Sequence, residues 1–319
     1  MSREQRIILL AGPTGVGKTA ASLSLAERLR TEVVNADSMQ IYRYLDIGTA
    51  KPTWEERERV RHHLLDIVDP DETFDAARYL EVAAAAIDAI HQHGKVPLVV
   101  GGTGLYMKVL TRGICEAAPA DANLRRQLLQ ELEARGLPRL HQELIEVDPE
   151  LAAKIHPNDR QRIIRALEVY RLTQTPLSRW QSQHRFQAAR YRSIKVFLFR
   201  DRHEMVERID RRVHWMMEQG FLHEVEQLLA MGYSPTLKPL QALGYKQLIQ
   251  HLSGQCSVDE AIQQIKRATR HYAKRQLTWF RGDPEFFWLH AEDDRELEDF
   301  VQRALEKPAP TFSRIPNYS

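Results

Sequence analysis

The stretch Gly12-Pro13-Thr14-Gly15-Val16-Gly17-Lys18-Thr19 matches the phosphate-loop pattern G-x-x-x-x-G-K-T at every fixed position. An apolar run, residues 7–11, precedes it, and residues 20–26 follow with a helical pattern. Strand, glycine turn and helix thus come in the order that points backbone N–H groups at phosphate oxygens. Lys18 supplies a positive charge for those oxygens, and the hydroxyl of Thr19 is a suitable ligand for Mg²⁺. The stretch therefore predicts a binding site for a di- or triphosphate.

The composition is that of a globular protein. The 319 residues are 43% hydrophobic and 28% charged, and the net charge of +2 does not by itself indicate a nucleic-acid partner. Cys115 and Cys256 stand far apart, so we expect neither a disulfide framework nor a zinc site, and a reducing, cytoplasmic location fits. No apolar run reaches about 18 residues, and residues 1–6 lead directly into the first run. We expect neither a membrane span nor a signal peptide.

Short apolar runs alternate with helical patterns over the first hundred residues. We expect strands at 7–11, 32–36, 63–68, 96–100 and 194–199, in an α/β fold with a P-loop NTPase-like parallel sheet. The stretch between the last two strands shows only helical spacing, and the chain after residue 199 is helical to about residue 280. The expected division is a core of residues 1–112 and 194–306, a helical insertion of residues 113–193, and a disordered tail of residues 307–319.

Ligands of parallel sheets bind beyond the carboxyl ends of the strands, so the residues after each strand are candidates for the site. Asp37 follows the second strand, where it is either a general base or the cap of a following helix. The fourth strand ends in Gly101-Gly102-Thr103-Gly104 and not in the acid of an ordinary P-loop ATPase. This ending argues against nucleotide hydrolysis, and it places Thr103 across the same crevice from Asp37.

Arg208 and Arg212 are four residues apart and share one helical face after the last core strand. They could close over a diphosphate. Alternatively, they lie on a solvated face with Glu204, Glu207 and Asp210 as partners, and these neighbouring acids favour that interpretation.

Residues 261–281 carry six basic side chains and no acidic one, interleaved with Tyr272, Trp279 and Phe280. A second basic cluster occupies residues 160–165. Basic residues among aromatic ones suit a polyanion with exposed bases, although a plain basic surface helix has the same composition. The two clusters indicate a large anionic substrate.

Together these stretches resemble the tRNA dimethylallyltransferase family (tRNA isopentenyltransferases). Besides the phosphate loop, the resemblance rests on Val34-Asn35-Ala36-Asp37-Ser38-Met39-Gln40-Ile41-Tyr42, on residues 100–106, 158–168 and 243–247, and on residues 274–281. It spans about residues 6–285. The zinc finger of eukaryotic members is missing, so the chain resembles the shorter bacterial form.

The resemblance implies transfer of a dimethylallyl group from dimethylallyl diphosphate to the exocyclic amine of the adenosine 3′-adjacent to the anticodon of tRNA. Lys18 and Mg²⁺ at Thr19 would stabilise the leaving diphosphate, Asp37 would be the base, and Thr103 would lie near the flipped nucleotide. The diphosphate would be held by Gly12, Pro13, Thr14, Gly15, Val16, Gly17, Lys18 and Thr19, with Arg208 and Arg212 as candidates.

The resemblance also assigns a long set of residues to the anticodon stem-loop. These are Asp37, Ser38, Met39, Gln40, Thr103, Arg125, Gln161, Arg162, Ile163, Ile164, Arg165, Gln241, Ala242, Leu243, Gly244, Tyr245, Lys246, Lys274, Arg275, Gln276, Leu277, Thr278, Trp279, Phe280 and Arg281. We expect a monomer. Two alternatives stay open: a small-molecule or nucleotide kinase with ATP in the loop, and an RNA-binding ATPase module.

Overall fold

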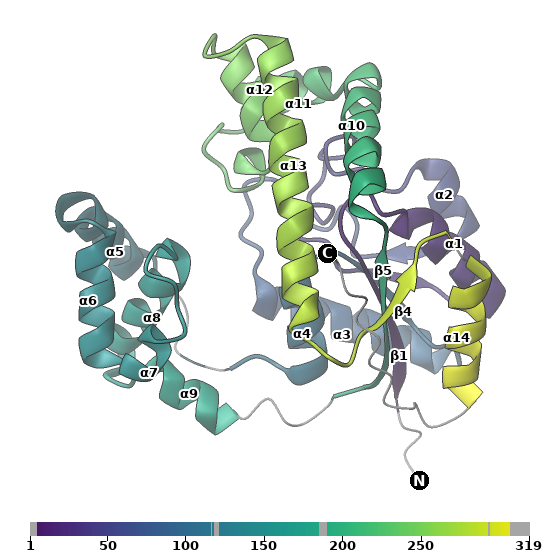
Figure 1. Ribbon diagram of the computed structural model, residues 1–319, viewed down its shortest axis with the longest axis horizontal. Helices are drawn as coiled ribbons and strands as arrows, with labels where there is room; N and C mark the ends of the chain where they lie inside the picture. The colour runs from purple at the N-terminus through teal and green to yellow at the C-terminus, as the bar shows by residue number, and fades with distance from the viewer. Residues whose placement is uncertain (1–4, 116, 118–120, 185–189, 293, 307–319) are drawn as a thin grey trace. The chain divides into compact units, whose positions relative to one another are not determined.

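A single sheet of six parallel strands, in the order β3-β2-β4-β1-β5-β6, forms the centre of the larger of two compact units (Figure 1). The computed structural model describes residues 5–115, 117, 121–184, 190–292 and 294–306. The predicted tail of residues 307–319 lies outside this range. The strands are β1 (Arg6–Ala11), β2 (Val33–Asn35), β3 (His62–His63), β4 (Leu98–Gly101), β5 (Arg192–Phe199) and β6 (Phe287–His290). The predicted α/β fold with a parallel sheet is confirmed.

Two edge strands differ from the sequence prediction. The strand expected at 63–68 ends at His63, because Leu64 and Asp66 adopt left-handed φ angles of 64° and 56° that an extended chain cannot accommodate. Strand β6 was not predicted, since its four residues follow a long helix and resemble the end of it in hydrophobicity. It extends the sheet by pairing with β5.

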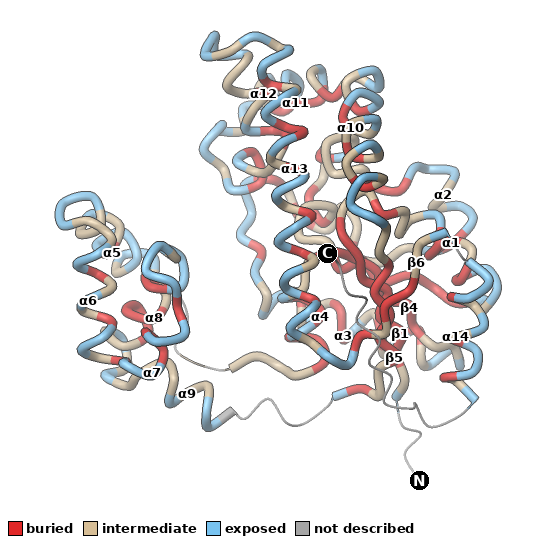
Figure 2. Tube along the Cα trace, viewed as in Figure 1, coloured by how far each residue is buried: buried red, intermediate tan, exposed pale blue. Residues whose placement is uncertain are grey.

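The inner strands are buried on both faces, which explains their continuous apolar sequences (Figure 2). On one face, Ile8 and Leu10 share a core with helices α1 (Lys18–Leu29) and α14 (Asp294–Glu306). On the other face, Phe197 of β5 lies with its ring centroid 4.9 Å from that of Phe280 on α13 (Val258–Arg281). Helices α3 (Ala76–Gln92) and α4 (Gly104–Arg112) contact each other through the stacked rings of Tyr79 and Tyr106.

A helical layer belonging to the same unit stands beyond the carboxyl ends of the strands. It consists of α10 (Arg202–Glu218), α11 (Phe221–Ala230), the 3₁₀ turn η1 (Pro239–Gln241), α12 (Tyr245–Leu252) and the long helix α13 (Figure 1). The short helix α2 (Trp54–Arg59) lies between β2 and β3 in the chain. Ser257 and Glu260 form a capping box at the start of α13, which fixes where this 24-residue helix begins.

The chain divides into two compact units, Met1–Thr111 with Tyr191–Ser319, and Arg112–Arg190. The regular secondary structure in the described part of the second unit is all helical, with α5 (Ala122–Arg135), α6 (Leu137–Val147), α7 (Pro149–Ala152), α8 (Arg160–Thr173) and α9 (Leu177–His184). It has its own apolar core, in which Leu128, Leu144 and Leu167 are fully buried. Among the helices that the structure describes, none combines the length and the apolar character needed to cross a bilayer.

Candidate functional site

A cavity of about 400 Å³ opens at the carboxyl ends of the strands, where the sequence predicts the site. Lys18, Thr19 and Asp37 line it together, as do parts of α10 and α13. The opposite wall is apolar and comes from the helical layer, with Ile209, Val213, Met216, Phe221, Leu243 and Ile265. The cavity thus places a phosphate loop, a carboxylate and an apolar surface around one space.

Backbone geometry and two arginines shape the phosphate loop. Gly15 and Gly17 have φ angles of 85° and 110°, which side chains other than glycine rarely adopt. Two of the loop carbonyls accept from these arginines: Gly15 O accepts from Nε of Arg208, and Val16 O accepts from Nε of Arg200, both at 2.9 Å. Since α1 begins at Lys18, its first N–H groups face the same space.

Lys18 and Arg212 both line this cavity and bring positive charge into it. Burial lowers the pKa of Lys18 to about 8, and nearby Arg212 lowers it further while Asp37 opposes the shift. Nζ of Lys18 donates to the carbonyl oxygens of Gly12 at 2.9 Å and Pro13 at 3.0 Å. Burial also lowers the pKa of Arg212. Two desolvated cations beside a ring of backbone N–H groups make a strong site for an anion.

The solvated-face interpretation of Arg208 and Arg212 does not match the structure. Arg208 bonds to the phosphate loop, and Arg212 lines the cavity. The acids that were expected to be their partners pair with other residues: Glu204 with Arg200, Asp210 with Arg270, and Glu207 with His203.

Asp37 makes a local turn and does not cap a helix. Its Oδ1 accepts the N–H of Met39 at 2.8 Å, and its own N–H donates to Oδ1 of Asn35 at 3.1 Å. The capping alternative is wrong, because residues 37–50 form turns and the next helix begins at Trp54. Within the described residues, no hydrogen bond or ion pair occupies the second carboxylate oxygen. Asp37 therefore has one fixed oxygen and one that is available to a substrate.

The glycine-rich turn after β4 owes its glycines to packing. A Cβ on Gly101 would lie 2.2 Å from the carbonyl oxygen of Ala36, and one on Gly104 would lie 2.1 Å from the indole nitrogen of Trp279. Thr103 Oγ1 accepts the N–H of Ser38 at 3.0 Å, directly beside Asp37. The turn thus lets α13 approach closely and ties β4 to the segment that carries the candidate base.

Five residues assigned to tRNA contact have buried side chains, so the prediction for these side chains needs correction. Each is at most 5% exposed because it packs into the interior: Ile163, Ile164, Tyr245, Gln276 and Phe280. Other members of the set are exposed, among them Gln161, Arg162, Gln241, Lys246, Lys274, Arg275, Thr278, Trp279 and Arg281. Ala242, Leu243 and Gly244 line the cavity, as do Ser38, Met39 and Gln40.

The helical unit carries the remaining candidates, Arg125 and residues 161–165. Arg125 and Arg165 both approach the buried carboxylate of Glu168, at 3.7 Å and 2.8 Å. Glu168 therefore holds these two arginines in one basic group within the helical unit.

Sequence reasoning missed Glu224, a buried residue that binds the backbone of the loop after β2. A signal was present: Glu224 stands three residues after Phe221 and four before Leu228, on the apolar face of α11. A carboxylate at such a position requires buried donors.

Comparisons with known proteins agree with one another. A model of the family described as IPP transferase matches residues 40–283. The tRNA dimethylallyltransferase of Syntrophobacter fumaroxidans is 60% identical over 291 residues, covering 91% of this chain and 85% of that protein. The tRNA dimethylallyltransferase 2 of Geotalea uraniireducens is 51% identical, covering 89% and 92%.

Solved structures extend the likeness to the whole fold. The crystal structure of the tRNA isopentenylpyrophosphate transferase from Bacillus halodurans has a TM-score of 0.71 at 38% identity, covering 95% of this chain and 97% of that one. A eukaryotic dimethylallyltransferase acting on tRNA has a TM-score of 0.76 at 32% identity, covering 94% and 78%.

Proposed function

The chain belongs to the IPP transferase family, as do the two tRNA dimethylallyltransferases similar to it, and we propose that the cavity lined by the phosphate loop binds dimethylallyl diphosphate. The activity is the transfer of a dimethylallyl group to tRNA, and the comparisons support this activity over that of a kinase. The observation that carries the proposal is a pair of desolvated cations, Lys18 and Arg212, that line one cavity together with Asp37 and with apolar side chains of the helical layer.

The phosphate loop holds the leaving group. As the bond from the five-carbon group to its oxygen breaks, negative charge grows on the diphosphate, where Lys18, Arg212 and the loop N–H groups stabilise it. The apolar wall, which includes Met216 and Phe221, excludes water from the carbon that is attacked.

Mg²⁺ fits this site as an ion bound mainly by the substrate. Thr19 offers one hydroxyl to the cavity, and among the described residues no three His, Cys, Asp or Glu side chains gather around a common point. When bound, the ion neutralises charge on the departing diphosphate.

Asp37 acts as the base. The exocyclic amine of adenosine is a weak nucleophile, and the available carboxylate oxygen of Asp37 accepts its proton as the new bond to carbon forms. The base to be modified must leave the anticodon stack, at a cost of a few kcal/mol. Exposed residues of α13, including Lys274 and Trp279, bind the RNA and offset that cost.

The test is a labelled-transfer assay. The protein is incubated with unmodified tRNA, Mg²⁺ and dimethylallyl diphosphate labelled in the hydrocarbon, with ATP replacing the donor in a parallel tube. We expect the label in tRNA and, after digestion to nucleosides, on the amine of one adenosine. Absence of label in tRNA, together with phosphate transfer from ATP, would contradict the proposal.

A further inference from the structure

The carboxylate of Glu224 is buried and binds a loop that lies about 180 residues earlier in the chain. Oε2 accepts the N–H groups of Asp46 at 3.0 Å and Ile47 at 2.6 Å. Oε1 accepts the N–H of Gly48 at 3.1 Å and the hydroxyl of Tyr245 at 2.6 Å. Burial and the Glu224 carboxylate raise the pKa of Tyr245 well above its usual value, so its hydroxyl stays protonated and donates. Four donors thus satisfy one carboxylate.

The side chain of Gln40 joins the bound loop to the turn that carries the candidate base. The carbonyl oxygens of Thr49 and Ala50, which directly follow the bound residues, each accept from Nε2 of Gln40 at 3.1 Å. Gln40 stands three residues after Asp37, and both side chains line the cavity. Gln40 thus supports the turn that carries Asp37 from the side of the 46–50 backbone, while Thr103 supports it from the side of β4.

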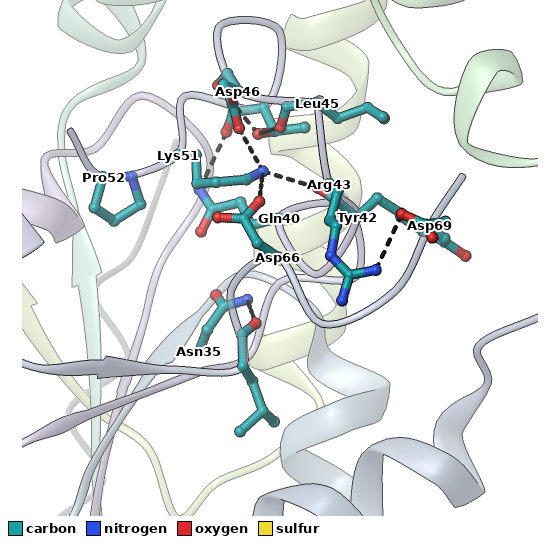
Figure 3. A network of polar contacts seen from close by, with 12 residues as sticks. Asn35, Gln40, Tyr42, Arg43, Leu45, Asp46, Lys51, Pro52, Asp66 and Asp69 are labelled. Atoms are coloured by element: carbon teal, nitrogen blue, oxygen red, sulfur yellow. Dashed lines mark hydrogen bonds and ion pairs between the residues drawn. The ribbon is translucent and has the colours of Figure 1, made fainter. Parts of the chain in front are cut away.

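A separate anchor holds the same loop from the side of the sheet (Figure 3). The buried ammonium of Lys51 donates to the carbonyl oxygen of Tyr42 at 2.8 Å and to the carboxylates of Asp46 and Asp66 at 2.5 Å. Lys51 ties the loop to its own neighbours, whereas Glu224 ties it to α11. The two anchors are therefore not redundant.

The loop packs tightly against α11 and α12 at Gly48. A Cβ on Gly48 would lie 2.1 Å from the ring of Phe221 and 2.6 Å from that of Tyr245. Gly244, which precedes α12, also packs tightly, since a Cβ there would lie 2.8 Å from the ring of Phe221. Gly48, Phe221 and Tyr245 also line the cavity, so this contact forms part of its wall.

We infer that Glu224 is a positioning residue for the transfer reaction. By holding the backbone of residues 46–48 on α11, it sets the turn at residues 37–40 and with it the direction of the Asp37 carboxylate. This inference rests on the proposed function of the cavity. Under this inference the helical layer helps to orient the base, and Glu224 itself contacts neither substrate.

Glu224→Gln tests the inference, because an amide has the same shape but only one acceptor oxygen. The NH₂ group of the glutamine would replace one of the two acceptor oxygens and would point at two donors. Buried N–H groups would then be left unpaired. We expect kcat to fall by about 100-fold, as for a misplacement on the order of 1 Å, with little change in tRNA affinity. Hydrogen exchange at the amides of residues 46–48 should accelerate in the same variant.

Tyr245→Phe is the milder variant, since it removes one donor and leaves the three backbone bonds in place. We expect a decrease in kcat of less than about 10-fold. Glu226→Gln, a matched change at an exposed position of the same helix, should leave kcat and amide exchange unaltered.

Thermal unfolding establishes that each variant is folded at the assay temperature. A folded Glu224→Gln protein with wild-type kcat would overturn the inference, as would faster exchange at residues 46–48 without loss of kcat. Should Glu224→Gln fail to fold, Tyr245→Phe decides: wild-type kcat in that variant overturns the inference, and a decrease in kcat supports it. Failure of the proposed function is separate, because the wild-type protein would then transfer no label.

Discussion

The backbone N–H of Thr14 donates to Oε1 of Gln276 at 2.9 Å, although the two residues are 262 positions apart in the chain. The other end of the same amide donates to the carbonyl oxygen of Gly102, also at 2.9 Å. One side chain of α13 thus joins the phosphate loop to the turn after β4. Helix α13 and the phosphate loop are therefore joined directly by one side chain.

Gln276→Glu should weaken binding of dimethylallyl diphosphate. The change removes the donor to Gly102 and places a negative charge beside the phosphate loop, where desolvation strengthens its repulsion of the substrate. We expect KM for the donor to rise by about tenfold or more, because the lost bond and the repulsion together cost at least about 1.4 kcal/mol. Gln276→Met, which loses both bonds without adding charge, is the control. An equal KM in the two variants would show that charge is not the cause.

Binding of the donor should become coupled to proton uptake as the pH rises past about 8. In the protein without donor, Lys18 has a pKa of about 8, so it is charged below that pH and neutral above it. A bound diphosphate should raise this pKa and restore the charged form. Affinity should accordingly fall by up to about tenfold per pH unit above pH 8. Calorimetry at pH 7 and pH 9, in buffers of different ionisation enthalpy, measures the uptake. Equal uptake at both values would contradict the shifted pKa.

The two tight glycines after β4 should differ in their tolerance of alanine. At Gly101 the obstacle is the backbone of Ala36, which cannot move without breaking the sheet, so Gly101→Ala should cost about 3 kcal/mol or more. At Gly104 the obstacle is the ring of Trp279, which is 40% exposed and can turn aside, so the cost should be nearer 1 kcal/mol. Denaturant unfolding of both variants measures the difference. Equal losses would mean that Trp279 is as fixed as the backbone.

Asp37→Asn should lower kcat far more than it lowers affinity for tRNA. The amide keeps the hydrogen bond from Met39 but cannot accept a proton in the transition state, so we expect a loss of about 10²- to 10⁴-fold. Rapid-quench measurement of the transfer step and filter binding of tRNA separate the two quantities. A loss confined to binding would make Asp37 a contact residue only.

Lys274→Ala should weaken tRNA binding and reduce its dependence on salt. Lys274 is exposed on α13, so we expect the slope of log affinity against log salt to decrease by about 0.7 to 0.9. Lys266 on the same helix is the comparison, because it is buried against His214 and faces no solvent. An unchanged slope for Lys274→Ala would place this face of the helix away from the RNA.

The phosphate loop and the inner strands could be predicted because their signals are local. A glycine pattern is informative when an apolar run such as residues 7–11 precedes it and a helical pattern follows it, because the three stretches support one another. The edge strand β6 has only three apolar residues before His290, too few to distinguish it from the end of a helix. The left-handed residues that end β3, Leu64 and Asp66, carry no glycine signal at all.

The contacts that complete the site could not be predicted, since they join distant parts of the chain. Nothing near Thr14 indicates Gln276, and nothing near Gly48 indicates Glu224. The prediction for α13 was also wrong in part. Its basic and aromatic residues suggested one exposed surface, yet the side chains of Gln276 and Phe280 are buried.

The buried positions of α13 recur at Thr269, Ala273, Gln276 and Phe280, and the exposed basic ones fall between them. Because the two sets share no member, a substitution at Lys274 leaves the loop contact of Gln276 untouched. The charge at position 274 can therefore be changed while the bonds from Gln276 to Thr14 and Gly102 stay in place. One helix in this way keeps the side chains that hold the two glycine-rich turns together separate from the basic side chains that meet solvent.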